Sequence, residues 1–205
     1  MAYVTPGTVA AGDVATAAAW NVVVNDVIDH ETRISSSGLV HLNTTTFSAL
    51  STTLDIDDVF SATYENYYVM TTWVSSVGSE LRIQFRTTGG ATTATTSAYY
   101  YAAPGHTSSN ANGADYSSGA LPRITLGSSG GSSDGQSSAA GYFFRPFVAD
   151  YTMTTTTNTR YAAGIATSRV YGGAHAVATS YAGVRLFPNT GNITGTFRIF
   201  GVING

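Results

Sequence analysis

The pattern that most constrains the fold begins after residue 38, where apolar and polar residues alternate with a period of two. In the clearest run, residues 81–86 read Leu-Arg-Ile-Gln-Phe-Arg. Such alternation puts apolar side chains on one face of a strand and polar side chains on the other. Glycine-rich turns separate the runs, and no long helical pattern interrupts them. We therefore predict a mainly β protein, an antiparallel β-sandwich with a jelly-roll-like strand order.

The strand signals fall in a series of short segments. Tyr67–Val74 is apolar on both faces and is expected at the centre of a sheet. In the last segment Phe197 and Ile199 are expected to face the core, and Pro146 favours an edge or a bulge for its own segment. The predicted strands are Tyr67–Val74, Leu81–Arg86, Tyr99–Ala102, Leu121–Leu126, Tyr142–Val148, Met153–Asn158, Tyr161–Thr167, Ala174–Thr179, Gly183–Phe187 and Thr194–Ile203.

A helical pattern precedes the strands. Thr16 is a good N-cap for a helix that runs from Ala17 to about Arg33. Residues spaced alternately three and four apart give this helix an apolar stripe. The chain then divides into an extended anchoring arm (1–12), an N-terminal helix for oligomerisation or attachment (13–36) and the β-sandwich domain (37–205). The stripe consists of Trp20, Val23, Val27, His30 and Ile34.

Two interpretations of this stripe stay open. The helix can dock on its own domain, as amphipathic helices usually do. Alternatively, three copies meet on an axis, with His30 as a polar core position that fixes the register. An isolated helix of this length is marginal in water, so either interpretation requires a partner surface. We expect residues 1–34 to join the chain to a larger assembly, with other copies in a homotrimer.

The composition excludes several classes of partner. Only 10% of the residues are charged, against about a quarter in an average protein. The net charge is −3 and the nine basic residues form no cluster in the sequence, which argues against nucleic acid. Cysteine is absent, the N-terminus does not resemble a signal peptide, and the apolar run 14–24 is too short to cross a bilayer. We expect synthesis in the cytoplasm and no membrane insertion.

Catalytic and cofactor signatures are weak. Residues 127–131 match the nucleophile-elbow pattern G-x-S-x-G, but the residues that follow cannot start a helix. The four histidines are scattered, and only His106 lies near a carboxylate, that of Asp115. The acidic run at 55, 57 and 58 fits either a hard cation or the capped start of a short helical turn that ends near Tyr64, and capping needs fewer assumptions. We expect no enzymatic activity, no metal and no cofactor.

Tyrosines supply a different signal. Three consecutive strand residues, Tyr99 to Tyr101, must place at least one ring away from the core. Exposed tyrosines make good contacts for subunits or sugars. Two long loops, 104–119 and 127–138, are further candidates for contact with a partner. The candidate ligand contacts are Tyr99, Tyr100, Tyr101, His106, Asp115 and Tyr116.

Several segments resemble virion proteins of tailed bacteriophages. Residues 12–21 are similar to the G-D-x-x-T-A-A-x-W-N segment that starts the anchoring helix of fibre and minor tail proteins. Residues 59–67 resemble the V-F-x-x-x-Y-x-N-Y element that enters the main sheet in such proteins, and residues 82–90 and 193–202 fit the same template. These motifs touch both ends and the middle of the chain, and none of them is catalytic.

The resemblance implies a trimeric β-domain that is exposed on the virion and anchored there by its N-terminus. It fits a fibre or minor tail protein with host-surface binding, and a capsid decoration or head-fibre protein is the first alternative. A carbohydrate-binding module that uses Tyr99–Tyr101 and a polysaccharide-degrading enzyme built on His106 and Asp115 are the alternatives. A host-surface glycan is the ligand that the tyrosines suggest.

Overall fold

The structure is a computed structural model that describes residues 21–25, 27, 38–90, 93–95, 97–107, 112–131 and 134–203; for residues 106, 107 and 112–120 it describes the backbone alone. Contacts divide the chain into two units, one from Leu39 to Val202 and one made of residues 1–38 and 203–205. Residues 21–25 and 27 are helical. The predicted division at residues 12 and 36 stays a prediction.

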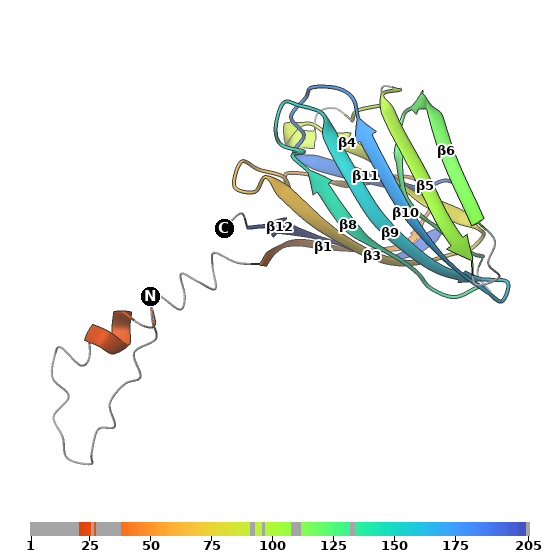
Figure 1. Cartoon of the computed structure of the whole chain (residues 1–205), viewed down its shortest axis with the longest axis horizontal. Helices are drawn as coiled ribbons and strands as arrows, with labels where there is room; N and C mark the ends of the chain where they lie inside the picture. Colours follow the sequence, from red (N-terminus) through yellow and green to blue (C-terminus); the bar gives the residue numbers. More distant parts are fainter. Residues whose placement is uncertain are drawn as a thin grey trace, which may run out of the picture. The chain divides into compact units, whose positions relative to one another are not determined.

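Strands dominate the unit from Leu39 to Val202 (Figure 1). A short 3-10 helix, η1, spans Thr88–Gly90. The strands are β1 (Leu39–Leu50), β2 (Leu54–Ile56), β3 (Asn66–Ser75), β4 (Ser79–Arg86), β5 (Tyr99–Thr107), β6 (Asn112–Leu121), β7 (Ile124–Ser129), β8 (Ser137–Phe144), β9 (Thr152–Ala162), β10 (Ile165–His175), β11 (Gly183–Pro188) and β12 (Ile193–Val202).

Eight of these strands follow the jelly-roll order. One sheet contains the run β1-β12-β3-β8, and the other is β2-β11-β4-β7. The chain crosses between the sheets at each step from β1 to β4, turns back within one sheet from β4 to β7, and crosses at each step again through β8, β11 and β12. Neighbouring strands are antiparallel. The predicted antiparallel sandwich of jelly-roll type is therefore confirmed.

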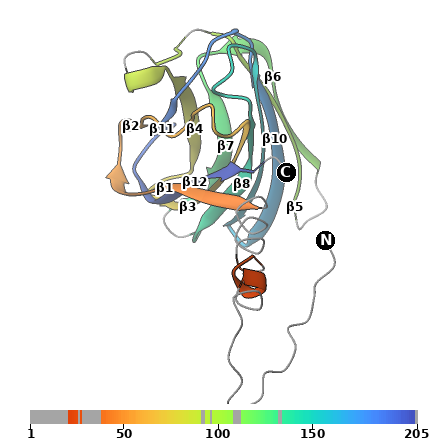
Figure 2. The same cartoon turned by 90° about the vertical axis from the view of Figure 1, so that its left-hand side faces the viewer.

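Two inserted hairpins widen one sheet. The hairpin β5–β6 lies between β4 and β7 in sequence, and β9–β10 lies between β8 and β11. Both join the same sheet, whose order becomes β1-β12-β3-β8-β9-β10-β5-β6. Figures 1 and 2 show β8, β9, β10, β5 and β6 side by side in one broad layer, with β2, β11 and β4 in a layer opposite β1, β12 and β3. The large sheet thus has an outer face that the four-stranded sheet does not cover.

Apolar residues that alternate along the central strands form the core between the sheets. β3 lies between β12 and β8, as its apolar sequence predicted. Phe197 and Ile199 of β12 face inward and are fully buried, which also confirms the prediction. Large aromatic rings pack edge to face around them. Fully buried members of the core include Tyr67, Trp73, Leu81, Ile83, Phe85, Phe143, Val184 and Leu186.

The polar face of β4 is more buried than its alternation predicted. Gln84 and Arg86 are both buried. The Gln84 side chain donates to the carbonyl of Pro122 over 2.8 Å. The Arg86 guanidinium donates to Asp57 over 2.6 Å and to the carbonyl of Gly90 over 2.6 Å. Satisfied hydrogen bonds allow these polar groups to be buried.

The acidic run does not cap a helical turn. Residues 54–56 form strand β2, and no helix follows between Asp57 and Tyr64 in the described chain. Asp55 receives two hydrogen bonds from Arg185, at 2.6 and 2.8 Å, on the neighbouring strand β11. Arg185 lowers the pKa of Asp55 chiefly through this hydrogen bond. The carboxylates therefore pair with arginines across strands, a contact between residues 130 apart that no local pattern reveals.

Two predicted strands differ from the structure, one because it contains a turn and one because its strand ends earlier. The segment Tyr161–Thr167 contains the β9–β10 turn, where Ala163 and Gly164 both have positive φ, at 50° and 79°. Such a two-residue turn matches the strand twist, but it lacks the Asn-Gly or Asp-Gly signal. The segment Ala174–Thr179 ends early, because β10 stops at His175.

Two other segments change in the same way. Pro122 lies in the break that divides Leu121–Leu126 between β6 and β7. Tyr142–Val148 ends at Phe144, and Arg145 has a φ of 54°, which interrupts the extended backbone.

The long loops and the first strand also differ from expectation. Most of 104–119 belongs to β5 and β6, which pair as a hairpin, and 127–138 includes the end of β7 and the start of β8. Residues 127–129 and 137–138 pair in strands, whereas the described residues 130, 131 and 134–136 lie outside strands. Strand β1, at 39–50, was not predicted, because its middle reads Asn-Thr-Thr-Thr and two register shifts break its alternation.

One buried side chain ties β7 to the large sheet. The Asn158 carboxamide on β9 accepts from the Ser128 amide over 3.1 Å and donates to the Ser138 carbonyl over 2.9 Å. We expect Asn158→Leu to lower the free energy of unfolding in urea by about 2–3 kcal/mol, because buried partners on both sides lose their hydrogen bonds. Thr157→Ala, on the exposed side of the same strand, is the control and should change it by less than about 0.5 kcal/mol. Equal stabilities of the two variants would contradict this role.

Candidate functional site

The outer face of the large sheet carries two adjacent transverse rows of residues, which we name the aromatic belt. Strand pairing sets the rows, because residues in register on neighbouring antiparallel strands share a face. The first row is His41, Phe200, Tyr68, Tyr142, Thr155, Gly172 and Ala102. The second row is Leu39, Val202, Asn66, Phe144, Met153, Ala174 and Tyr100.

The rings of the belt contact one another from β1 to β8. The centroids of His41 and Phe200 lie 5.5 Å apart, and those of Tyr68 and Tyr142 lie 5.0 Å apart. Tyr142 also stacks with Phe144, at 5.9 Å. Such contacts hold the rings in place, so that a partner would lose little side-chain entropy in binding them. The belt is a preorganised surface that still exposes 39% of Tyr142 and 51% of Met153.

Charge is nearly absent from this face. Within the described strands β1, β12, β3, β8, β9 and β10, Arg198 is the one charged side chain that points outward. Arg160 and Arg169 share the inward face of their strands with buried residues. This face thus carries almost none of the chain's few charged residues and forms one broad, nearly uncharged surface.

The face changes character along the strands. A row of hydroxyl side chains crosses the sheet four residues beyond Tyr68. Given the rise per residue of a strand, this row lies about 14 Å from Tyr68. The belt lies toward one end of the face, and beyond the hydroxyl row the exposed side chains of Val74 and Tyr161 follow two residues farther along their strands. This hydroxyl row is Thr46, Thr196, Thr72, Ser138, Thr159 and Ser168.

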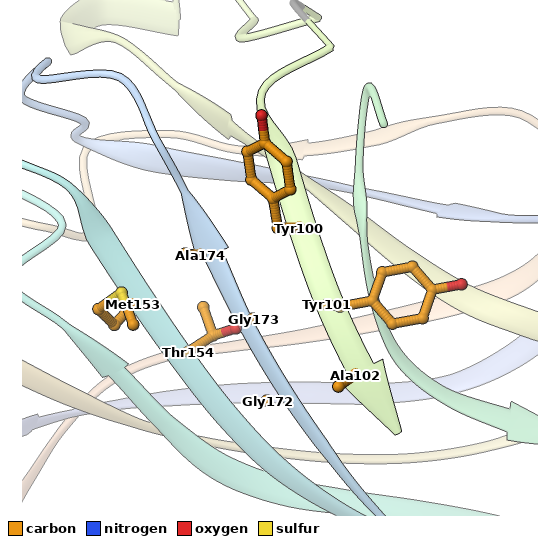
Figure 3. Close-up of a pocket in the computed structure, with 8 residues that line it drawn as sticks. All are labelled: Tyr100, Tyr101, Ala102, Met153, Thr154, Gly172, Gly173 and Ala174. Atoms are coloured by element: carbon orange, nitrogen blue, oxygen red, sulfur yellow. The ribbon is translucent and has the colours of Figure 1, made fainter. Parts of the chain in front are cut away.

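A shallow trough interrupts the second row of the belt (Figure 3). It encloses about 380 Å³ and has Gly172, Gly173 and Ala174 in its middle strand. Tyr100 and Met153 stand on the strands at either side. A Cβ atom added to Gly172 would meet no atom within 4 Å. Gly172 therefore leaves room beside an exposed ring, and an apolar side chain of a partner would fit there.

The tyrosine run is divided between the two faces. Tyr99 is fully buried, its hydroxyl donating to the Ala94 carbonyl over 3.0 Å and accepting from the Phe85 amide over 2.9 Å. Burial raises the pKa of this phenol well above its usual value. Tyr99 is thus a core residue, and its prediction as a ligand contact is wrong. Tyr100 points outward with 43% of its surface exposed, and Tyr101 is half-buried.

Register separates two of the other predicted contacts. His106 pairs with Asn112, whereas Asp115 pairs with Ala103, three residues along the hairpin. Tyr116 pairs with Ala102. The side chains of His106, Asp115 and Tyr116 lie outside the described part of the structure, and their contact roles stay predictions.

The predicted anchoring stripe is only partly described. Val23 and Val27 are helical and exposed. Trp20, His30 and Ile34 lie outside the described residues. The oligomerisation role of this stripe stays a prediction.

Sequence reasoning missed the aromatic belt. The second apolar face of Tyr67–Val74 was assigned to burial at the centre of a sheet, yet Met70 and Val74 are exposed. Most outward-facing positions in residues 142–144 and 198–202 also hold aromatic or apolar side chains. They would have indicated the belt, but only after the strand order was known.

No group of three or more His, Cys, Asp or Glu side chains that could hold a metal occurs among the described residues. In the same part of the chain, no helix is long and apolar enough to cross a membrane.

Comparison with protein-family models gave no match, and comparisons with curated proteins and with solved structures gave no significant match.

Proposed function

We propose that this chain is a structural subunit of a tailed-bacteriophage particle. Residues 1–34 attach the subunit to the particle, and its β-sandwich associates with other copies of the chain through the aromatic belt. The observation that carries the proposal is the belt on an outer face with a single described charge, Arg198. A homotrimer is the form that the helix stripe favours. Fibre, minor tail and capsid decoration or head-fibre positions are all compatible with such a subunit.

The belt has the composition of an interface core. Interface cores are rich in tyrosine, phenylalanine and methionine and poor in charge. Contiguous apolar patches on monomers usually mark contact sites. Among the described residues of strands β1, β12, β3, β8, β9 and β10, Arg198 is the one charge on this face that identical copies would bring together. A second copy of the chain is thus a chemically matched partner.

The phage assignment is supported by residues 12–21 and by the positions of the other motif residues. Phe60 and Tyr67 contact edge to face at 4.6 Å, and the Tyr67 hydroxyl donates to the Ser61 carbonyl over 2.9 Å. These contacts give the V-F-x-x-x-Y-x-N-Y element a packing role in the core. The attachment role therefore depends on the N-terminal motif.

A truncation tests the attachment role. We expect a chain that lacks residues 1–34 to keep the thermal unfolding midpoint of the sandwich within a few degrees, but to be absent from purified particles in which the full chain is present. Thr159→Arg in the full chain is the control and should be incorporated normally. Normal incorporation of the truncated chain would contradict the attachment role.

A further inference from the structure

A polar pocket lies on a different part of the molecule from the belt. It is formed where the ends of β4 and β7 meet the inward side of β9 and β10, and it encloses about 320 Å³. The lining residues are Gly78, Ser79, Glu80, Ser128, Ser129, Arg160, Arg169 and Asn189.

Arginines gather around this pocket. Arg160 and Arg169 line it, and Arg82 donates to Glu80 over 2.8 Å. Arg123 is close enough to Arg82 and Glu80 for both to influence its pKa, although burial is the main reason that this pKa is lowered. Four of the nine arginines therefore lie in or beside one groove.

Two described acids lie at this groove. Glu80 lines the pocket, and Asp134 lies near enough to Arg160 to be influenced by it. The Asp134 carboxylate already accepts from the amides of Gly131, over 2.7 Å, and Ala163, over 2.8 Å. The described acids therefore stand beside Arg82 and Arg160, on a chain whose net charge is −3.

Arg160 is weakly bonded in the structure. Its Nη1 donates to the Ser129 carbonyl over a long distance, 3.4 Å, and its buried Nε has no hydrogen-bond partner among the described residues. A guanidinium in a protein usually binds a carboxylate or phosphate through paired N–H groups. Arg160 has capacity for such a ligand.

The rest of the lining selects against a bare anion. Glu80 would repel a small anion held by Arg160, but its carboxylate accepts hydrogen bonds from hydroxyl groups. The Asn189 carboxamide and the hydroxyl of Ser128 can donate as well as accept. A lining that combines a cationic donor with neutral and anionic acceptors fits a ligand that carries both a carboxylate and hydroxyl groups.

We propose that this pocket binds an acidic saccharide, a sugar ring bearing a carboxylate, with the carboxylate on Arg160 and ring hydroxyls on Glu80 and Asn189. The site lies on the inward side of β9 and β10, whereas the aromatic belt lies on their outer side. A volume of about 320 Å³ admits a ligand of the size of one or two sugar rings.

Binding of an oligogalacturonate to the full chain tests the proposal by calorimetric titration. The matched neutral probe is an oligogalactose of the same length and linkage, and inorganic sulfate is the probe for an anion alone. We expect oligogalacturonate to bind, the neutral probe to bind at least about tenfold more weakly, and sulfate not to compete at equal concentration, since a hydrogen bond to a charged group is worth about tenfold or more in affinity.

Two variants locate the site. Arg160→Gln should weaken oligogalacturonate binding by about tenfold or more, and Arg145→Gln, which removes an exposed arginine paired with Asp150 over 3.0 Å, should leave it unchanged. Thermal unfolding of both variants shows that they are folded. Unchanged affinity in Arg160→Gln, equal affinity for the neutral probe, equal competition by sulfate, or no binding by the unmodified chain would each overturn the proposal.

Discussion

Replacing Tyr142 and Met153 together with arginine is expected to convert the associated protein into a monomer. Both side chains belong to the aromatic belt and are exposed by 39% and 51%. Each interface between copies would gain four positive charges in an apolar contact where no acidic side chain is described. Desolvating unpaired charges costs several kcal/mol, which weakens association by orders of magnitude. Sedimentation of the variant against the unmodified chain measures the change.

The matched control for this variant is Thr159→Arg. Thr159 lies on the same strand and the same outer face as Met153, six residues and about 20 Å away in the hydroxyl row. It adds the same charge outside the belt, and we expect association to persist. If Thr159→Arg dissociated the protein as fully as the double variant, general charge and not the belt would control assembly.

Acidification is expected to destabilise the sandwich through one buried histidine. His175 is fully buried among Tyr99, Tyr181 and Phe85, with its ring centroid 4.1 Å from that of Tyr99. The Tyr181 hydroxyl lies 2.9 Å from Nδ1, and Nε2 has no hydrogen-bond partner among the residues described. Burial lowers the pKa of His175 to about 4 from the ordinary 6.5.

The lowered pKa fixes the direction of the pH effect. Between pH 6.5 and 4 the unfolded chain binds a proton at His175 and the folded chain does not, so each step down in pH favours unfolding. The stability that is fully present above pH 6.5 falls by about 3 kcal/mol as the pH reaches 4. Asp55 acts at lower pH, because its pKa is lowered from 3.8 and its contribution is lost only below that value.

Urea unfolding at a series of pH values measures this effect. His175→Phe removes the titrating group and keeps a ring in the cluster, and we expect it to be less stable at pH 7 but to show a much flatter profile between pH 6.5 and 4. An unchanged profile in that variant would assign the acid sensitivity to other groups.

The sandwich could be predicted from the sequence because apolar and polar residues alternate within each strand, whichever strand lies beside it. Phe197 and Ile199 face the core, as expected from their spacing, and β3 is central because Tyr67–Val74 is apolar on both sides. Periodicity is a local property, and these assignments need only local information. The turn at Ala163 and Gly164 was not predicted, because this residue pair is not a standard hairpin-turn sequence and the residues beside it give no hairpin signal.

The functional surfaces needed the strand order. His41, Phe200, Tyr68 and Tyr142 come from four separated segments and become neighbours only when β1, β12, β3 and β8 are placed side by side. Arg160 and the pocket around it likewise depend on the inserted hairpin β9–β10. The exposure of Tyr100 agrees with the prediction that at least one of three consecutive tyrosines in a strand points away from the core.

The most direct test of self-association is the mass of the purified full-length chain in solution, measured by sedimentation equilibrium over a wide range of concentrations. Association through the belt predicts a species whose mass is a multiple of 21.3 kDa, and the helix stripe favours a threefold multiple. A single species of 21.3 kDa at every concentration would contradict the account.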